Sequence, residues 1–479
     1  MNEALEHYSR DRSHHGEPVP GAHCGSAGGA ACGDVLRIGF RLRAGRLADV
    51  RIGSEGCAAA RAAAAAAAEL LDGATLAEAA LLSPPTIEEE LGGLTGIGRH
   101  GPQLAADAVH RALGAAALSG EPLLDPPADP GSERVLVALS GGVDSAVACH
   151  RERERGAEVF AVTLELWSDP ANDGEQSCCS PQAVRLARSV AHSIGVPHLT
   201  VDLRDRFRAG VVEPFLAGYA AGSTPNPCVR CNGSVRLEPM IAIARRLGAV
   251  GLATGHYARV VDDGEGPLLA PAADEGKDQC YMLAGLPTES LARLRFPLGG
   301  LRKSEVRRIA AEAGIPVAGR PESQDLCFLA GEGKRGFLAR HGGLGSRPGE
   351  IVDSGGRRLG KHDGHHNFTV GQRKGIGVGA PEPLYVLATD ARSNRVVVGP
   401  AAELERDRVE VGEVVLHRPA AQVDAVKLRY RSPALGCRLG DDGAGGFEVE
   451  LERPVRRPAP GQTAVFLADE AIVGHGVIG

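Results

Sequence analysis

The sequence predicts a multidomain fold: an α+β N-terminal domain, an α/β domain built on a parallel sheet, a small central domain and a C-terminal β-barrel. The chain has 479 residues, more than one ordinary hydrophobic core holds, because domains average roughly 150 residues. Residues 121–134 carry four prolines between an alanine-rich helical stretch and an apolar strand, as interdomain linkers do. Strands and helices alternate after this segment, and short strands of alternating polarity follow residue 408.

The N-terminal segment is expected to combine a hairpin with a helix. Residues 35–52 alternate apolar and polar side chains around a glycine-containing turn, which is typical of two paired strands. A run of alanines follows Cys57 and indicates a helix. These elements give the α+β class for the front of the chain.

The segment after the linker predicts a doubly wound parallel sheet. Strands are expected at 135–139, 159–165, 198–201 and 250–254, with a helix after the first strand and another at 182–194. Such an order places ligands at the carboxyl ends of the strands.

The rear of the chain differs in both pattern and charge. Four alternating segments, at 408–417, 424–431, 446–452 and 463–468, predict a small β-barrel. Residues 333–374 carry nine Lys/Arg, three Asp/Glu and four His, whereas residues 1–132 carry ten Arg, no Lys and seventeen Asp/Glu. The basic stretch could meet phosphates or simply be a solvated loop region.

Composition excludes a membrane protein and a disulfide framework. The chain is 43% hydrophobic and 24% charged, which is typical of a globular protein. Its longest weakly polar run, residues 57–71, is mostly alanine and contains Arg61, so no membrane span is expected. The polar N-terminus does not resemble a secretory signal, and we expect a cytoplasmic protein. There, eleven cysteines are expected to be ligands, nucleophiles or buried thiols.

A glycine-rich turn, SGGVDS at 140–145, follows the first strand of the predicted sheet. Glycines there allow backbone N–H groups and a helix N-terminus to face an anion. No Gly-Lys-Ser/Thr closes the loop, so it is not a Walker A motif. The motif resembles the pyrophosphate loop of the ATP pyrophosphatases, which adenylate a carbonyl or carboxylate oxygen. That resemblance implies that the loop holds ATP phosphates and that Asp144 helps to place Mg²⁺.

Two thiols with C-x2-C spacing, Cys228 and Cys231, lie on a proline-stiffened loop that is expected to lead into a helix at Ser234. This spacing can chelate a metal or cluster, and a helix N-terminus lowers a thiol pKa from about 8.5 toward neutrality. A third thiol, Cys327, lies nearly a hundred residues further on. Only the fold can bring it to the other two.

Seven motifs occur in the order found in the tRNA-specific 2-thiouridylase family. They are SGGVDS (140–145), TPNPCVRCN (224–232), ATGHYAR (253–259), KDQCY (277–281), SQDLCF (323–328), VGQRKGIG (370–377) and LRYRSP (428–433). The resemblance covers about residues 133–479 and implies conversion of the tRNA wobble uridine, U34, to 2-thiouridine. ATP adenylates the C2 oxygen, and sulfur carried by the enzyme displaces AMP. Thiolates suit the second step, because they are strong nucleophiles near neutral pH.

The same resemblance implies roles for individual residues. Cys231 is the nucleophile and Cys327 carries the persulfide. The implied ATP-binding residues are Ala138, Leu139, Ser140, Gly141, Gly142, Val143, Asp144, Ser145, Leu164 and Gly255. The implied contacts to the target base or tRNA are Asn226, Pro227, Cys228, His256, Lys277, Asp278, Gln279, Arg429, Tyr430 and Gln462.

The sulfur carrier has two interpretations. Many relatives have Asp where this chain has Cys228, so Cys228, Cys231 and Cys327 could ligate a [4Fe-4S] cluster that binds the donor sulfide. Alternatively, the persulfide passes between Cys327 and Cys231 without a cluster, and Cys228 is a bystander.

The front of the chain, about residues 4–115, resembles the NifU-like iron-sulfur scaffold family. Cys32, Asp34, Cys57 and His100 match site positions and are candidate ligands for zinc or a cluster. Gly101 stands where that family has its third cysteine, and Cys24 is not expected to replace it. The alternative is a degenerate docking domain for a cysteine desulfurase, because loss of one ligand weakens a four-ligand site.

Together, these features predict an ATP-dependent tRNA sulfurtransferase fused to a scaffold-like domain, acting with tRNA and with a cysteine desulfurase or sulfur relay protein. The expected divisions are a NifU-like domain at 1–120, a linker at 121–133, a pyrophosphatase domain at 134–333, a basic tRNA-binding domain at 334–404 and a barrel at 405–479. The alternatives are another ATP pyrophosphatase, or an iron-sulfur carrier whose rear portion only binds nucleotide.

Overall fold

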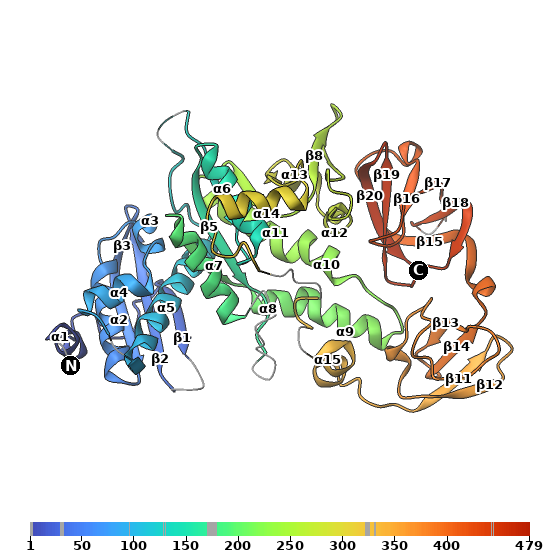
Figure 1. Ribbon diagram of the computed structural model, residues 1–479, viewed down its shortest axis with the longest axis horizontal. Coiled ribbons are helices and arrows are strands. Elements are labelled where there is room, and N and C mark those ends of the chain that lie inside the picture. Colours follow the sequence, from blue (N-terminus) through green and yellow to red (C-terminus); the bar gives the residue numbers. More distant parts are fainter. Residues whose placement is uncertain are drawn as a thin grey trace.

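The computed structural model describes residues 3–28, 33–94, 96–127, 129, 131–169, 180–320, 326–329, 332–441, 443 and 445–479. The molecule is elongated, with the N-terminal domain at one end, the parallel sheet in the middle and two β-rich units at the other end (Figure 1). Among the described helices, none has the length and apolar character needed to cross a membrane. The predicted multidomain class is confirmed.

The N-terminal domain is a three-stranded antiparallel sheet, in the order β1-β2-β3, covered by helices. The predicted hairpin and alanine-rich helix are both present, and the alanines of that helix are almost all buried. The elements are α1 (Glu3–Arg10), β1 (His23–Gly28), β2 (Val35–Arg43), β3 (Arg46–Glu55), α2 (Ala58–Leu71), α3 (Leu76–Ala80), α4 (Pro84–Glu90), η1 (Gly96–Arg99) and α5 (His100–Leu118).

The middle domain is the predicted doubly wound parallel sheet, with strand order β10-β7-β4-β5-β6. Apolar clusters cover both faces, one formed with α6, α7 and α14 and the other with α5 and α11. The elements are β4 (Arg134–Ala138), α6 (Val143–Glu154), β5 (Glu158–Glu165), α7 (Pro181–Ser193), β6 (His198–Asp202), α11 (Leu237–Arg246), β7 (Gly251–Thr254), β10 (Leu294–Arg295) and α14 (Lys303–Glu312).

A helical segment between β6 and β7 and two short helices after β9 complete this domain. The first segment contains two π-helical stretches, η2 and η3. The elements are α8 (Arg204–Phe207), η2 (Arg208–Val212), α9 (Glu213–Ala220), α10 (Pro227–Arg230), η3 (Cys231–Arg236), α12 (Cys280–Leu283) and α13 (Thr288–Leu291).

The rear of the chain forms a four-stranded sheet and a barrel. The sheet has the order β12-β11-β14-β13 and follows α15, a helix that the sequence pattern did not predict. Its elements are α15 (Gly333–Gly342), β11 (Gly349–Asp353), β12 (Arg358–His362), η4 (His365–Asn367), β13 (Tyr385–Asp390), β14 (Arg395–Gly399) and η5 (Ala401–Leu404).

The predicted C-terminal barrel is present and closes because β15 pairs with both β18 and β20. Strands β8 and β9, which come from the middle of the chain, extend its sheet through the pair Ile472 and Leu269. The elements are β8 (Arg259–Asp262), β9 (Pro267–Ala270), β15 (Glu405–Leu416), η6 (Ala420–Gln422), β16 (Ala425–Lys427), β17 (Leu435–Asp441), β18 (Phe447–Arg456), β19 (Thr463–Ala468) and β20 (Ala471–Ile478).

The N-terminal domain is docked on the edge of the parallel sheet through α5 and β6. Any side chain at Gly114 of α5 would overlap the carbonyl oxygen of Thr200 on β6, so the backbones are in close contact. The linker region is also held, because the backbone N–H of Leu123 donates to the carbonyl of Arg246 at 2.7 Å. The two domains are therefore joined by packing as well as by the chain.

Polar side chains fix this docking. The buried Asp107 carboxylate on α5 accepts hydrogen bonds from Arg188 at 2.6 Å and from Arg185 at 2.9 Å, both on α7. The Arg111 guanidinium donates to both carboxylate oxygens of Glu165, at 2.6 and 2.9 Å, and to the carbonyl of Ser26 at 2.8 Å. Arg111 thereby links β1 of one domain to the carboxyl end of β5 of the other.

Candidate active site

The SGGVDS motif forms a closed turn between β4 and α6. Gly141 has a φ of +71°, a conformation that favours glycine. The Ser145 hydroxyl accepts a hydrogen bond from the Ser140 backbone N–H at 3.1 Å and donates to the Gly142 carbonyl at 3.1 Å. Gly142 caps α6 without a side-chain hydrogen bond. The first N–H groups of α6 can therefore face an anion, as the motif predicts.

Gly255 lies directly behind this turn. A Cβ atom at this position would lie 2.6 Å from the Ser145 nitrogen and 2.8 Å from the Asp144 carbonyl carbon. The chain after β7 therefore approaches the first turn of α6 at a distance that only glycine allows. This close approach gives Gly255 a packing role beside the adenosine contact implied by resemblance.

A cavity of about 450 Å³ opens in front of the turn. In its wall, the Asp144 carboxylate accepts hydrogen bonds from the Lys303 ammonium at 2.6 Å and the Tyr257 hydroxyl at 2.8 Å. Arg320 donates to the Gly141 carbonyl at 3.2 Å. Lys303 and Arg320 were not predicted, because single Lys and Arg residues far from the loop carry no local signal. Tyr257 lies in the ATGHYAR motif, but the sequence did not assign it a role.

The cysteine segment is helical, and the expectation of a loop up to Ser234 is wrong. Helix α10 begins at Pro227, because the Asn226 side chain accepts hydrogen bonds from the backbone N–H groups of Cys228 and Val229, at 3.2 and 3.4 Å. Proline suits the first helical position, where its missing N–H has no partner to lose. Cys231 then begins the π-helical stretch η3.

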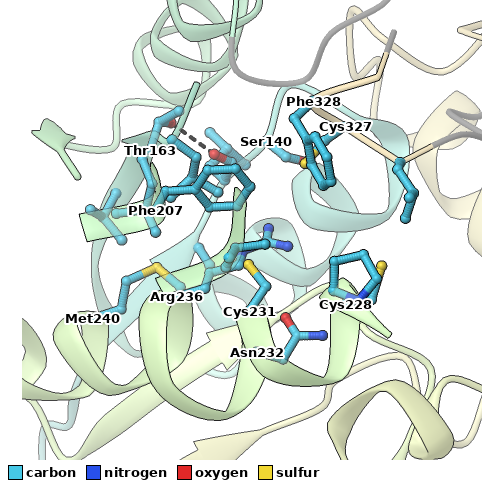
Figure 2. A pocket seen from close by; sticks show the side chains of 18 of the residues that line it. Ser140, Thr163, Phe207, Cys228, Cys231, Asn232, Arg236, Met240, Cys327 and Phe328 are labelled. Atoms are coloured by element: carbon cyan, nitrogen blue, oxygen red, sulfur yellow. Dashed lines mark hydrogen bonds between the residues drawn. The ribbon is translucent and has the colours of Figure 1, made fainter. Parts of the chain in front are cut away.

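The three candidate thiols line one cavity of about 290 Å³. Figure 2 shows Cys231 on the helical segment, with its sulfur directed into the cavity, and Cys327 on a separate segment beside Phe328. The Phe328 ring packs against Phe207, Phe215 and Phe337, with centroids 5.1–5.8 Å apart. This aromatic cluster anchors the residue next to Cys327. Residues 323–325 of the SQDLCF motif lie outside the described residues.

The two cavities adjoin. Their shared lining residues are Ala138, Ser140, Arg236 and Gln279. Leu139 and Leu164, implied by resemblance to contact ATP, line the thiol cavity, and Val143 and Asp144 line the other. The SGGVDS turn and the three thiols therefore meet at the carboxyl ends of β4 and β5.

The residues implied to contact tRNA divide into three groups. His256, Lys277, Gln279 and Tyr430 line the cavity in front of the SGGVDS turn, and burial lowers the pKa of His256, which keeps it neutral. Pro227 and Cys228 line the thiol cavity, directly after the capping residue Asn226. The remaining three make internal contacts. Asp278 accepts a hydrogen bond from the Ala272 backbone, Arg429 donates to the Arg457 carbonyl, and Gln462 donates to the Thr224 carbonyl.

Three of the four candidate ligands in the N-terminal domain meet. One ligand atom each of Asp34, Cys57 and His100 lies within 4.8 Å of the others. His100 Nε2 is 2.7 Å from Asp34 and 3.4 Å from the Cys57 sulfur. The hydrogen bond with His100 holds the pKa of Asp34 below its usual range, and burial raises the pKa of the Cys57 thiol. Cys32 lies outside the described residues.

Cys24 does not join these ligands. It pairs with Gly39 on β2, whereas the strand end near Asp34 pairs Gly28 with Val35. Cys24 and Gly28 are four residues apart along β1, so their Cα atoms are separated by roughly 13 Å.

Gly101 shows why the missing cysteine is not easily restored. A Cβ atom there would lie 2.7 Å from the Ala59 carbonyl oxygen, because α5 and the start of α2 are in close contact. We expect Gly101→Cys to lower the stability of the N-terminal domain by about 1–3 kcal/mol, the cost of overpacking. Thermal denaturation measures this loss.

Gly98→Cys is the control for this prediction, since a Cβ atom there meets no other atom closer than 3.7 Å. Equal stability of both variants, with tighter zinc binding by Gly101→Cys, would contradict the packing argument.

Four family models match the chain in sequence order. They are the NifU-like N terminal domain at residues 1–117, the tRNA methyl transferase HUP domain at 133–331, the tRNA methyl transferase PRC-barrel domain at 335–400 and the aminomethyltransferase beta-barrel domain at 410–478.

Known proteins match over long stretches. The bifunctional protein NifU/MnmA of Rubrobacter xylanophilus is 47% identical over 99% of this chain and 97% of its own length. The tRNA-specific 2-thiouridylase MnmA of Acidithiobacillus ferrooxidans is 42% identical over 72% of this chain and 98% of its own. A solved 4-thiouridine synthetase in complex with RNA and ATP is 24% identical, covering 42% of this chain and 46% of its own, with a TM-score of 0.28. Both resemblances found in the sequence are confirmed, and the chain belongs to the family of bifunctional NifU/MnmA proteins.

Proposed function

We propose that the two adjoining cavities carry out the ATP-dependent 2-thiolation of uridine 34 in tRNA. The observation that carries the proposal is that the phosphate-binding turn and the thiols Cys231 and Cys327 share one continuous site at the carboxyl ends of β4 and β5. An ATP pyrophosphatase that transfers nitrogen instead of sulfur needs no thiols beside the nucleotide. A carrier protein would have no use for a nucleotide cavity joined to them.

The reaction has three chemical steps. The uridine C2 oxygen attacks the α-phosphorus of ATP, and pyrophosphate leaves. The terminal sulfur of a persulfide on Cys327 then attacks C2, and AMP leaves with the C2 oxygen. Attack of the Cys231 thiolate on the Cys327 sulfur releases 2-thiouridine and leaves a Cys231–Cys327 disulfide, which an external thiol reduces. Adenylation is needed because an amide-like oxygen is a poor leaving group.

The residues present fit the groups that this chemistry requires. Asp144 offers a carboxylate, the type of ligand that Mg²⁺ prefers, and the ion would neutralise phosphate charge. Asp34, Cys57 and His100 would hold zinc or an iron-sulfur cluster in the N-terminal domain. The persulfide needs a sulfur donor, and we propose a cysteine desulfurase or a sulfur relay protein. We propose a cytoplasmic reaction, because free thiols persist in a reducing compartment.

Nucleoside mass spectrometry of unmodified tRNA tests the function. Intact protein with ATP, Mg²⁺ and a persulfide donor is expected to give 2-thiouridine at position 34. Asp144→Ala is expected to lower the yield at least about a hundredfold, because phosphate and metal positioning is lost. Asp72→Ala, an exposed change at the residue that follows α2, is the control and should leave the yield unchanged. If the intact protein releases pyrophosphate but forms no thiouridine, another adenylated substrate replaces this proposal.

A further inference from the structure

Arg236 occupies the passage between the two cavities. Of the four residues that line both, Ala138, Ser140, Arg236 and Gln279, it is the one with a charged side chain. Figure 2 shows its side chain beside Cys231, with the guanidinium directed into the cavity. Among the described residues, no hydrogen bond or ion pair engages this guanidinium. It is therefore available to an anion.

The backbone places Arg236 and Cys231 together. They are the first and last residues of η3, five positions apart, which is the hydrogen-bonding interval of a π-helix. Both side chains consequently face the thiol cavity. A regular helix continued from α10 would rotate position 236 relative to Cys231, because its turn is shorter. The π-helical stretch therefore couples a nucleophile to a cation, and such stretches are frequent at functional sites.

Two cations beside the SGGVDS turn already have other partners. Lys303 binds the Asp144 carboxylate at 2.6 Å, and Arg320 donates to the Gly141 carbonyl. Both lie on the side of the SGGVDS turn away from the thiols, since neither lines the thiol cavity. They are suited to the outer phosphates of a nucleotide.

The α-phosphate is the group expected at the passage. The nucleotide phosphates bind at the turn, the uridine must reach the Cys327 persulfide in the thiol cavity, and the α-phosphorus is the atom at which the two substrates join. Negative charge develops there in the first two steps: on the α-phosphate oxygens when the uridine C2 oxygen bonds to phosphorus and pyrophosphate leaves, and on AMP when sulfur bonds to C2 and the C2–O bond breaks. A fixed guanidinium stabilises such charge strongly in a site shielded from water.

We infer that Arg236 binds the α-phosphate of ATP and of the adenylated uridine, and is a catalytic residue in the first two steps. The inference rests on the proposed thiolation. It extends that proposal by naming Arg236 as the cation that stabilises the negative charge developed during adenylation and during AMP release.

The test compares Arg236→Ala and Arg236→Lys with Arg245→Ala, an exposed arginine on the following helix. Single-turnover pyrophosphate release with saturating tRNA reports adenylation. We expect Arg236→Ala to slow release about 100- to 1,000-fold with a smaller change in the KM for ATP, as for removal of a transition-state ligand. Arg236→Lys should recover part of the rate, free guanidinium should partly rescue Arg236→Ala, and Arg245→Ala should match the intact protein.

Three results would overturn the inference. The first is a pyrophosphate release rate for Arg236→Ala within about twofold of that of the intact protein. The second is a change confined to the KM for ATP. The third is a loss of rate that neither Arg236→Lys nor added guanidinium restores, although the melting temperature is unchanged. If Arg236→Ala is unfolded, the pyrophosphate release rates of Arg236→Lys and Arg236→Gln are compared instead. Failure of the proposed function looks different, because the intact protein would then form no 2-thiouridine.

Discussion

Replacing Cys231 with serine is expected to remove the release of 2-thiouridine, while each enzyme molecule still releases about one pyrophosphate before it is blocked. Serine cannot attack the Cys327 sulfur, so the product stays linked to the enzyme and turnover falls at least about a thousandfold. Adenylation depends on the SGGVDS turn. The hydrogen bonds that close this turn join Ser140, Gly142 and Ser145 and do not involve Cys231. Nucleoside mass spectrometry and a pyrophosphate assay on the same sample separate adenylation from product release.

Cys228→Ala is the matched control for this experiment. It lies on the same helical segment and lines the same cavity, but in the persulfide relay it carries no sulfur and has only the target-base contact that the resemblance implies. We therefore expect Cys228→Ala to keep sulfur transfer, with the effect confined to the KM for tRNA, and no iron in anaerobically purified intact protein. Iron and sulfide in the intact protein, lost together with activity in Cys228→Ala, would replace the relay with a cluster held by the three thiols.

Asp107→Ala is expected to have the largest effect on stability. The change leaves the guanidinium of Arg188, which is 2% exposed, without its carboxylate partner. Burial already lowers the pKa of Arg188, which reflects the cost of keeping its charge in this site. Removing one partner of a buried pair costs about 3–5 kcal/mol. Hydrogen exchange of α5 and β6, together with the first transition in urea, measures the loss.

Two variants decide whether the charge pair is responsible. Arg188→Met in the Asp107→Ala background removes the unpaired charge and should restore much of the stability. Asp72→Ala, at an exposed helix end, should change it by less than about 0.5 kcal/mol. Failure of Arg188→Met to restore any stability would show that lost packing, and not the buried charge, causes the effect.

Local features were predictable from the sequence where a pattern or a motif carried them. The strands of the parallel sheet are short apolar runs bounded by turns, and the structure has them within one or two residues of the expected positions. The start of α10 was not predicted, because an Asn-Pro pair is as typical of a turn as of a helix start, where Asn226 acts as the cap. Strands β8 and β9 were missed because four residues are too few to show a period.

The sequence by itself determined which chemical groups this protein carries: a glycine-rich SGGVDS turn, a C-x2-C pair, a distant third thiol and an N-terminal NifU-like domain without its third cysteine. Those features depend on residue type and local spacing. Tertiary structure alone decided that Cys327 shares a cavity with Cys231, that Lys303 binds Asp144 and that Arg236 lies between two cavities. It also decided that the N-terminal domain is docked on β6. Such contacts join segments far apart in the chain, and packing of the whole fold, which no local pattern encodes, brings them together.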